Sequence, residues 1–304
     1  MKLDTNNEVF KEARSCKRKS IAEIIGKGLG IFIIVQIIIG FIITIINKLI
    51  FKVPMEEFFD TTEFMLLNLF GTGILTAALI INTKISKEKT VTLGFTKHDI
   101  LKEYSKGILI GIVTMCSVVL IGILTKSMTF TFNPDFLKKS SIIVFVLSFI
   151  GFLIQGMSEE VFVRGYFLVQ TARKKKNVNK AVYATAILFA SLHLFNEGIT
   201  FLSFINLILF GILAAVIFIK TGNIWQVSAF HSIWNFLQGN VFGILVSGQS
   251  LNNSLFICKF NKNMTLLNGG TFGAEGGLIV TVVYSIIILY LLKKPTKETT
   301  KKEA

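Results

Sequence analysis

Long runs of apolar residues recur along this chain and are separated by short polar stretches that are rich in lysine. A helix of about 20 apolar residues is long enough to cross the hydrocarbon core of a bilayer. Because a helix satisfies its own backbone hydrogen bonds, such runs predict transmembrane helices. The pattern predicts eight spans, at residues 28–47, 64–82, 107–125, 142–170, 181–196, 201–219, 224–246 and 277–292.

The predicted fold class is therefore all-α, a polytopic membrane helix bundle that forms a single integral membrane domain over residues 1–304. Residues 1–27 and 293–304 are expected to be tails. The composition agrees, because only 16% of the residues are charged, whereas soluble domains average about 25%. The Gly/Asn-rich stretch 248–276 is expected to be an external loop of loose structure.

The net charge of +14 raises the alternative of a nucleic-acid-binding protein. Its distribution argues against that alternative, because lysines and arginines flank the apolar runs, as membrane topology requires. They gather before the first span, between the second and third, between the fourth and fifth, and after the last. With an even number of spans these segments share one side, so both termini are predicted to be cytoplasmic. The apolar spans predict a multi-pass protein of the cytoplasmic membrane, and the Lys/Asn/Ile-rich composition suggests a bacterial origin.

Ionisable residues inside the predicted spans are candidates for a functional site, because they are expensive to place in a membrane. Glu160 and Arg164 stand four positions apart and are expected to pair on one helix. Glu159 lies about 100° further round the helix and is left without a partner there. A carboxylate in a partly dry cavity binds protons more strongly, which suits a general base. The candidate partner for Glu159 is His193, in another span.

Two further pairs have helical spacing. His231 and Asn235 are four residues apart and could both donate hydrogen bonds to one developing oxyanion. Phe189 and His193 share a face, so the phenyl ring is expected to pack beside the imidazole. Glycines such as Gly156 would let neighbouring helices approach closely.

Three motifs stand in order on separate spans: EEVFVR from Glu159, FASLH from Phe189 and HSIWN from His231. Their forms, EExxxR, FxxxH and HxxxN, resemble those of the CPBP family of CAAX proteases and bacteriocin-processing proteins, also called Abi, over residues 142–238. The resemblance implies an eight-helix, glutamate-dependent intramembrane endopeptidase, CAAX prenyl endopeptidase-like, in a class often labelled metalloproteases. It implies a water activated by Glu159 and His193, oxyanion partners in His231 and Asn235, and supporting roles for Glu160, Arg164 and Phe189.

The cofactor expectation is that none is required. Zinc is the alternative, with Glu159, His193 and His231 as ligands, because catalytic zinc usually takes three protein ligands. The chain lacks an HExxH motif, and the resemblance favours the metal-free mechanism. The expected partners are membrane lipid and a peptide or protein substrate, either lipidated or a bacteriocin precursor.

Two other functions are compatible with the pattern. A non-enzymatic bacteriocin self-immunity or scaffold protein could keep the same polar residues for structure. A proton-coupled transporter could use buried Glu and His as a relay, although no inverted repeat is visible in the sequence.

Overall fold

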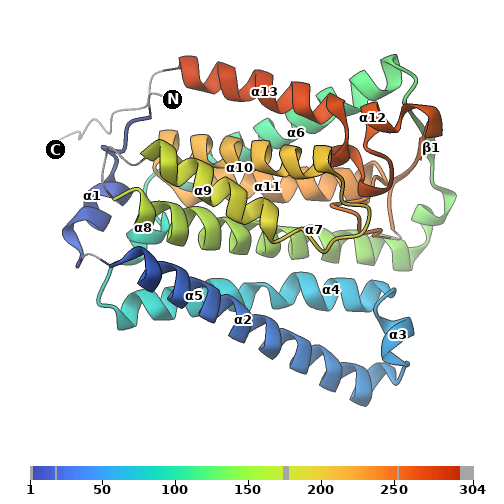
Figure 1. Ribbon diagram of the computed structural model, residues 1–304. Helices are drawn as coiled ribbons and strands as arrows, with labels where there is room; N and C mark the ends of the chain where they lie inside the picture. Colours follow the sequence, from blue (N-terminus) through green and yellow to red (C-terminus); the bar gives the residue numbers. More distant parts are fainter. Residues whose placement is uncertain (1–2, 18, 174–177, 252, 295–304) are drawn as a thin grey trace.

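The computed structural model describes residues 3–17, 19–173, 178–251 and 253–294. This part of the chain is mostly helical, and its long helices run roughly side by side (Figure 1). A two-stranded antiparallel sheet joins them, so the all-α prediction needs this correction. The elements are α1 (Glu8–Ser15), α2 (Ile21–Ile46), α3 (Met55–Phe58), α4 (Thr62–Gly71), α5 (Gly73–Ile85), α6 (Ile100–Leu124), β1 (Met128–Phe132), α7 (Lys139–Glu160), α8 (Val169–Thr171), α9 (Val178–Ser191), α10 (Phe201–Thr221), α11 (Ile224–Phe236), β2 (Phe256–Phe260), α12 (Thr265–Asn268) and α13 (Leu278–Lys293).

Within the described residues, five helical stretches are both long and apolar enough to cross a membrane. The protein is thus a multi-pass membrane protein. Helices α9, α11 and α13 also lie within predicted spans, but they are shorter, with 14, 13 and 16 residues. The five long stretches are Ile21–Phe51, Thr62–Ile85, Ile100–Leu124, Lys139–Thr171 and Phe201–Thr221.

Helix α7 occupies the middle of the bundle. It packs against α4 and α5 on one side and against α11 on the other. Figure 1 shows α2, α4 and α5 together below α7, and α6, α10, α11 and α13 above it. Beyond Glu160 the same helix continues through wider π-helical turns at Val161–Leu168, where all eight residues are buried. The motif of two glutamates and an arginine therefore lies at the centre of the bundle.

Local sequence signals set the ends of the helices around this centre. Thr200 caps α10 in a reciprocal hydrogen-bonded pair with Ser203, and Gly222 ends that helix in the left-handed conformation, with φ of 66°. Asn223 then caps α11, its side chain accepting a hydrogen bond from the backbone of Gln226. Side chains of this kind satisfy backbone donors that a helix start leaves unpaired. The tight turn between α10 and α11 fixes where His231 and Asn235 fall along the bundle.

Gly156 brings α7 and α11 into close contact, as the sequence predicts. A Cβ atom at this position would lie 2.8 Å from the backbone nitrogen of Ser232. Ser232 directly follows His231, so the contact sets the spacing between the helices that carry the first and third motifs. Small residues serve this purpose in membranes, where lipid is as apolar as the helix surfaces and packing must hold helices together.

The variant Gly156→Ala should therefore be less stable than the wild type, because the added methyl group forces α7 and α11 apart. Overpacking of this kind costs about 1–3 kcal/mol, which a thermal unfolding curve in detergent would detect. Gly40→Ala is the matched control, because a Cβ at Gly40 meets nothing within 4 Å. Equal unfolding midpoints for the two variants would contradict the proposed close contact.

Residues 253–276 form a strand and several helical turns, which corrects the expectation of loose structure over 248–276. Strand β2 pairs with β1, with Phe130 opposite Cys258. Burial raises the pKa of the Cys258 thiol to about 12. Glycines 269, 270 and 273 take positive φ angles of 90°, 59° and 90°, and these tight turns fold the rest of the segment against the bundle. Its residues Asn268, Phe272 and Glu275 are buried.

Several basic segments meet at one end of the bundle, where Figure 1 places α1, α8 and the end of α13. Glu88 is the buried centre of this end. Its Oε1 lies 2.9 Å from Lys19 Nζ and 3.3 Å from Arg173 Nη2, and Gln170 donates to its other oxygen at 3.2 Å. These contacts join the N-terminal segment to the loops that follow α5 and α8.

Candidate functional site

The core of the candidate site is the ion pair predicted from the first motif. Arg164 Nη1 lies 2.8 Å from Glu160 Oε1, and both side chains are 0% exposed. Arg164 also donates to the carbonyl oxygen of Gly211 in α10 at 3.3 Å, and its guanidinium group lies 4.9 Å from the centre of the Phe189 ring. A buried charge needs a partner of this kind, because desolvation alone costs several kcal/mol per ion. The prediction that Glu160 and Arg164 neutralise each other is confirmed.

Glu159 is in a different environment, since its side chain is 29% exposed. Its Oε1 accepts a hydrogen bond from Gln155 Nε2 on the same helix, so the expectation that it lacks a partner there is wrong. Its Oε2 lies 3.8 Å from His231 Nε2 on α11. Within the described chain Glu159 forms no ion pair with His193, and the imidazole that it faces belongs to the third motif.

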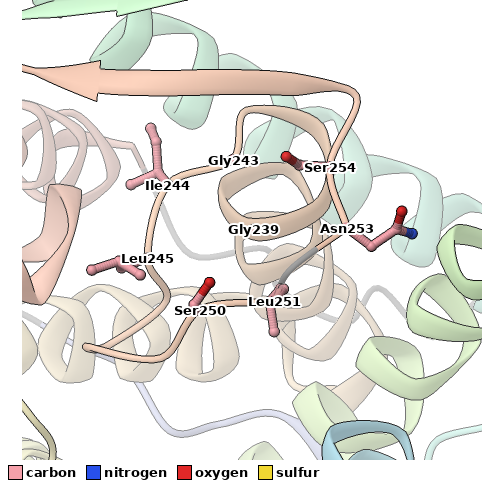
Figure 2. A pocket seen from close by; sticks show the side chains of 8 residues that line it. All are labelled: Gly239, Gly243, Ile244, Leu245, Ser250, Leu251, Asn253 and Ser254. Atoms are coloured by element: carbon pink, nitrogen blue, oxygen red, sulfur yellow. The ribbon is translucent and has the colours of Figure 1, made fainter. Parts of the chain in front are cut away.

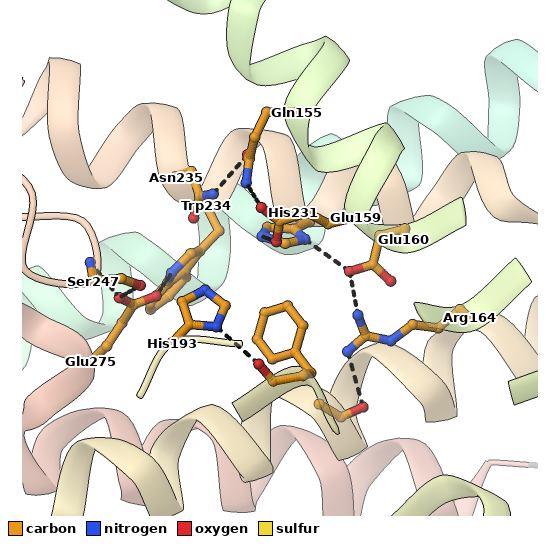
Figure 3. A network of polar contacts seen from close by, with 12 residues as sticks. Gln155, Glu159, Glu160, Arg164, His193, His231, Trp234, Asn235, Ser247 and Glu275 are labelled. Carbon is orange, nitrogen blue, oxygen red and sulfur yellow. Dashed lines mark hydrogen bonds and ion pairs between the residues drawn. The ribbon is translucent and has the colours of Figure 1, made fainter. Parts of the chain in front are cut away.

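His231 connects the two glutamates. Its Nδ1 lies 2.8 Å from Glu160 Oε1, which Arg164 also contacts. An ionised carboxylate can only accept hydrogen bonds, so Nδ1 carries a proton, and Nε2 is the nitrogen turned toward Glu159. The ring packs against Phe210 with 4.7 Å between ring centres. Figure 3 shows the resulting chain of polar contacts from Glu159 to Arg164.

His193 lies just beyond α9, in the turn that follows Ser191. Its Nδ1 is 2.9 Å from the carbonyl oxygen of Phe189, and a carbonyl only accepts, so this nitrogen also carries a proton. The Phe189 ring packs beside the imidazole at 4.8 Å, as the spacing predicts. In the neutral ring Nε2 therefore keeps its lone pair and can accept a proton.

Asn235 reaches Glu159 through a residue that sequence reasoning missed. Its Nδ2 donates to Gln155 Oε1 at 3.1 Å, and Gln155 Nε2 donates to Glu159. Gln155 precedes Glu159 by four residues, the helical spacing that could have identified it. An asparagine amide has two hydrogens, so one remains for another acceptor while the first is held by Gln155.

The alternative of a zinc site would need Glu159, His193 and His231 close together. Across the described residues, no group of three or more His, Cys, Asp or Glu side chains comes close enough to hold a metal ion. Glu159 and His231 approach each other, but His193 does not join them as a third ligand.

A separate cavity of about 90 Å³ lies beyond the end of α11 (Figure 2). Its lining includes Gly239, Leu245, Ser250 and Leu251, and none of the predicted site residues belongs to it. The candidate site is therefore the polar network, not this cavity.

Comparison with protein families shows that the network lies mostly within a known family domain. The family model described as "Type II CAAX prenyl endopeptidase Rce1-like" matches residues 141–237, about a third of the chain. Those residues are a domain of the Rce1-like type II CAAX prenyl endopeptidase (CPBP) family. The matched segment contains all three motifs, which confirms the resemblance stated from the sequence. The family is one of peptidases, and the chain carries its peptidase domain. Searches of curated proteins and of solved structures each found no match.

Gln155 provides a test of the network in the Rce1-like domain. Gln155→Leu keeps the side-chain size but leaves both Glu159 and Asn235 without their shared partner. Loss of a hydrogen bond to a charged group is worth about 1.5–3 kcal/mol, so we expect peptide cleavage to slow by at least tenfold in kcat. Gln36→Leu, at an exposed position of α2, is the control and should cleave at the wild-type rate. Equal rates for the two variants would show that Gln155 does not hold the site together.

Proposed function

We propose that this protein is an intramembrane endopeptidase that hydrolyses a peptide bond in a membrane-associated peptide or protein tail. The observation that carries the proposal is the contrast between adjacent carboxylates. Glu160 is fully buried and paired, whereas Glu159 is 29% exposed and faces an imidazole. Only the second is partly exposed, and a general base for hydrolysis must be open to a water molecule.

In the proposed reaction, a water molecule between Glu159 and His193 attacks the carbonyl carbon of the scissile bond. Glu159 takes one proton from the water as the new C–O bond forms. His193 Nε2 accepts a hydrogen bond from the same water, and the contact of Nδ1 with Phe189 orients the ring. The tetrahedral intermediate then collapses, the C–N bond breaks, and the proton passes from Glu159 to the leaving amine. The products are one carboxylate and one amine.

His231 and Asn235 are proposed to stabilise the oxyanion. Asn235 offers its second amide hydrogen, while Gln155 holds the first. His231 offers Nε2–H when both ring nitrogens are protonated. Donors fixed before the reaction stabilise developing charge most effectively.

The placement of the chain in the membrane is also a proposal. We infer eight spans in one integral membrane domain over residues 1–304, with the catalytic core at 142–238 and cytoplasmic tails at 1–27 and 293–304. The meeting of the N-terminal segment with the loops after α5 and α8 supports this topology, because all three are basic and share one end. A bacterial cytoplasmic membrane is the proposed location. The proposed substrates are a prenylated protein tail or a bacteriocin precursor.

Replacement of the proposed base tests the function directly. General-base catalysis contributes about 10²–10⁴-fold, so Glu159→Gln should lower kcat by at least a hundredfold, with little change in KM. The measurement is cleavage of quenched fluorescent peptides by protein in liposomes, with and without a prenylated cysteine. Glu63→Gln, at an exposed position of α4, is the matched control. Undiminished cleavage by Glu159→Gln would refute the proposed base.

Metal removal tests the proposal that no cofactor is required. Because the described site residues do not gather as a ligand set, incubation with a zinc chelator followed by dialysis should leave kcat within about twofold, since a metal-free Glu–His site loses no part of its acid–base chemistry. The measurement is the same liposome assay, with metal content read by mass spectrometry. Loss of activity that added zinc restores would show that the site binds metal.

A further inference from the structure

Glu275 is a second buried carboxylate near the site, and it lies outside the segment that the family model matches. It belongs to the loop between α12 and α13 and is 5% exposed. It accepts hydrogen bonds from Trp234 Nε1 at 3.2 Å, from Ser247 Oγ at 2.7 Å and from the Ser247 backbone nitrogen at 2.9 Å. Buried carboxylates are costly unless they are hydrogen-bonded, and the three donors offset that cost.

The first of these bonds holds α11. Trp234 is 0% exposed and stands between His231 and Asn235 in the third motif. Its ring also packs on Tyr284 of α13, at 5.1 Å between ring centres. A rotation of α11 that moved His231 away from Glu160 would also pull the indole nitrogen from Glu275. The bond therefore fixes the rotation of the helix that carries the proposed oxyanion donors.

The other two bonds lead to His193. The carbonyl oxygen of Ser247 accepts a hydrogen bond from Asn196 Nδ2 at 2.9 Å. The backbone nitrogen of Asn196 in turn donates to the carbonyl oxygen of His193 at 3.0 Å. The turn that carries His193 is thus tied to Ser247, and Ser247 is tied to Glu275. Figure 3 shows Glu275 joined to Ser247 and Trp234, on the side of the network away from Arg164.

The backbone of Glu275 is itself anchored. Its carbonyl oxygen accepts a hydrogen bond from Asn206 Nδ2 of α10 at 2.8 Å, and the same amide donates to Gly277 at 2.9 Å. Asn206 Oδ1 accepts from Thr281 of α13 at 2.6 Å. Because α10 and α13 hold the loop from both sides, the carboxylate is a fixed point relative to the bundle.

The structure assigns Glu275 as a positioning residue of the peptidase site. It holds α11 through Trp234 and the turn of His193 through Ser247, so that the proposed oxyanion donors and the proposed water-activating histidine face one substrate carbonyl. Glu275 itself touches none of the predicted catalytic side chains in the described structure. This inference rests on the proposed function of those side chains.

Steady-state kinetics of Glu275→Gln test the assignment. Glutamine keeps the shape of the glutamate side chain. Its amide group, however, turns N–H hydrogens toward one of the groups that now donate to Glu275, either Trp234 or Ser247. We expect kcat to fall on the order of tenfold, as for loss of one hydrogen bond to a charged group, with KM within twofold. Trp234→Phe should give a similar loss of kcat. The double variant should lose no more than about the larger of the two single losses, because coupled residues are non-additive.

Glu88→Gln is the matched control, since Glu88 is also buried and hydrogen-bonded but lies at the charged end of the bundle. It should lower the unfolding temperature and leave kcat within twofold. If Glu275→Gln behaves in the same way as Glu88→Gln, the positioning role is overturned and Glu275 is only structural. If Glu275→Gln does not fold, Trp234→Phe decides alone, and an unchanged kcat in that variant overturns the assignment.

Tryptophan fluorescence tests the contact of Glu275 with Trp234 independently of the proposed function. The chain has two tryptophans, so in a Trp225→Phe background the fluorescence reports Trp234 alone. Glu275→Gln should shift its emission, whereas Glu88→Gln should not, and an unshifted spectrum overturns the assignment. Retained cleavage by Glu159→Gln, together with a shifted spectrum, would instead refute the proposed base while the contact of Glu275 stands. If Glu275→Gln then leaves kcat unchanged, its link to catalysis is refuted as well.

Discussion

A carboxylate buried among apolar helices must be neutralised by groups that come from those helices. Glu160 meets this constraint by contacting Arg164 and His231 through one oxygen, at 2.8 Å each. Arg164 lies in the π-helical turns Val161–Leu168 that continue α7, and His231 belongs to α11, so the three side chains join the first motif to the third. Removing Arg164 would leave an uncompensated buried charge, which costs about 3–5 kcal/mol. The relative position of α7 and α11 depends on this requirement.

The same constraint separates two neighbouring glutamates that look alike in the sequence. Glu160 points into the buried interior, where its carboxylate pairs with Arg164 and His231. Glu159, about 100° away around the helix, is partly exposed and keeps one oxygen beside His231. A buried ion pair can thus orient an adjacent reactive group without taking part in the chemistry.

Helical spacing predicted the contacts that lie within one helix, and it could not predict the contacts between helices. Glu160 with Arg164 and Phe189 with His193 follow from a four-residue separation. The same spacing also joins Gln155 to Glu159. Gln155 was not predicted as a site residue because its side chain carries no charge. Which imidazole faces Glu159 depends on how α9 and α11 pack around α7, and no local pattern encodes that. The order in 248–276 comes from glycine turns and strand pairing with residues more than a hundred positions earlier.

Helix α11 shows how a polar site can be held in place where the hydrophobic effect does not drive helices together. Lipid is as apolar as the helices, so packing of small residues and hydrogen bonds must fix their positions. On α11, Ser232 meets Gly156, and Trp234 donates to Glu275. Ser232 and Trp234 are two positions apart, so they point about 200° away from each other around the helix. Neighbouring residues therefore contact α11 on nearly opposite sides, at positions between His231 and Asn235. The proposed chemistry depends most on the directions of those two side chains. The contact with Gly156 lies within the segment that the family model matches, whereas the contact with Glu275 comes from residues beyond it.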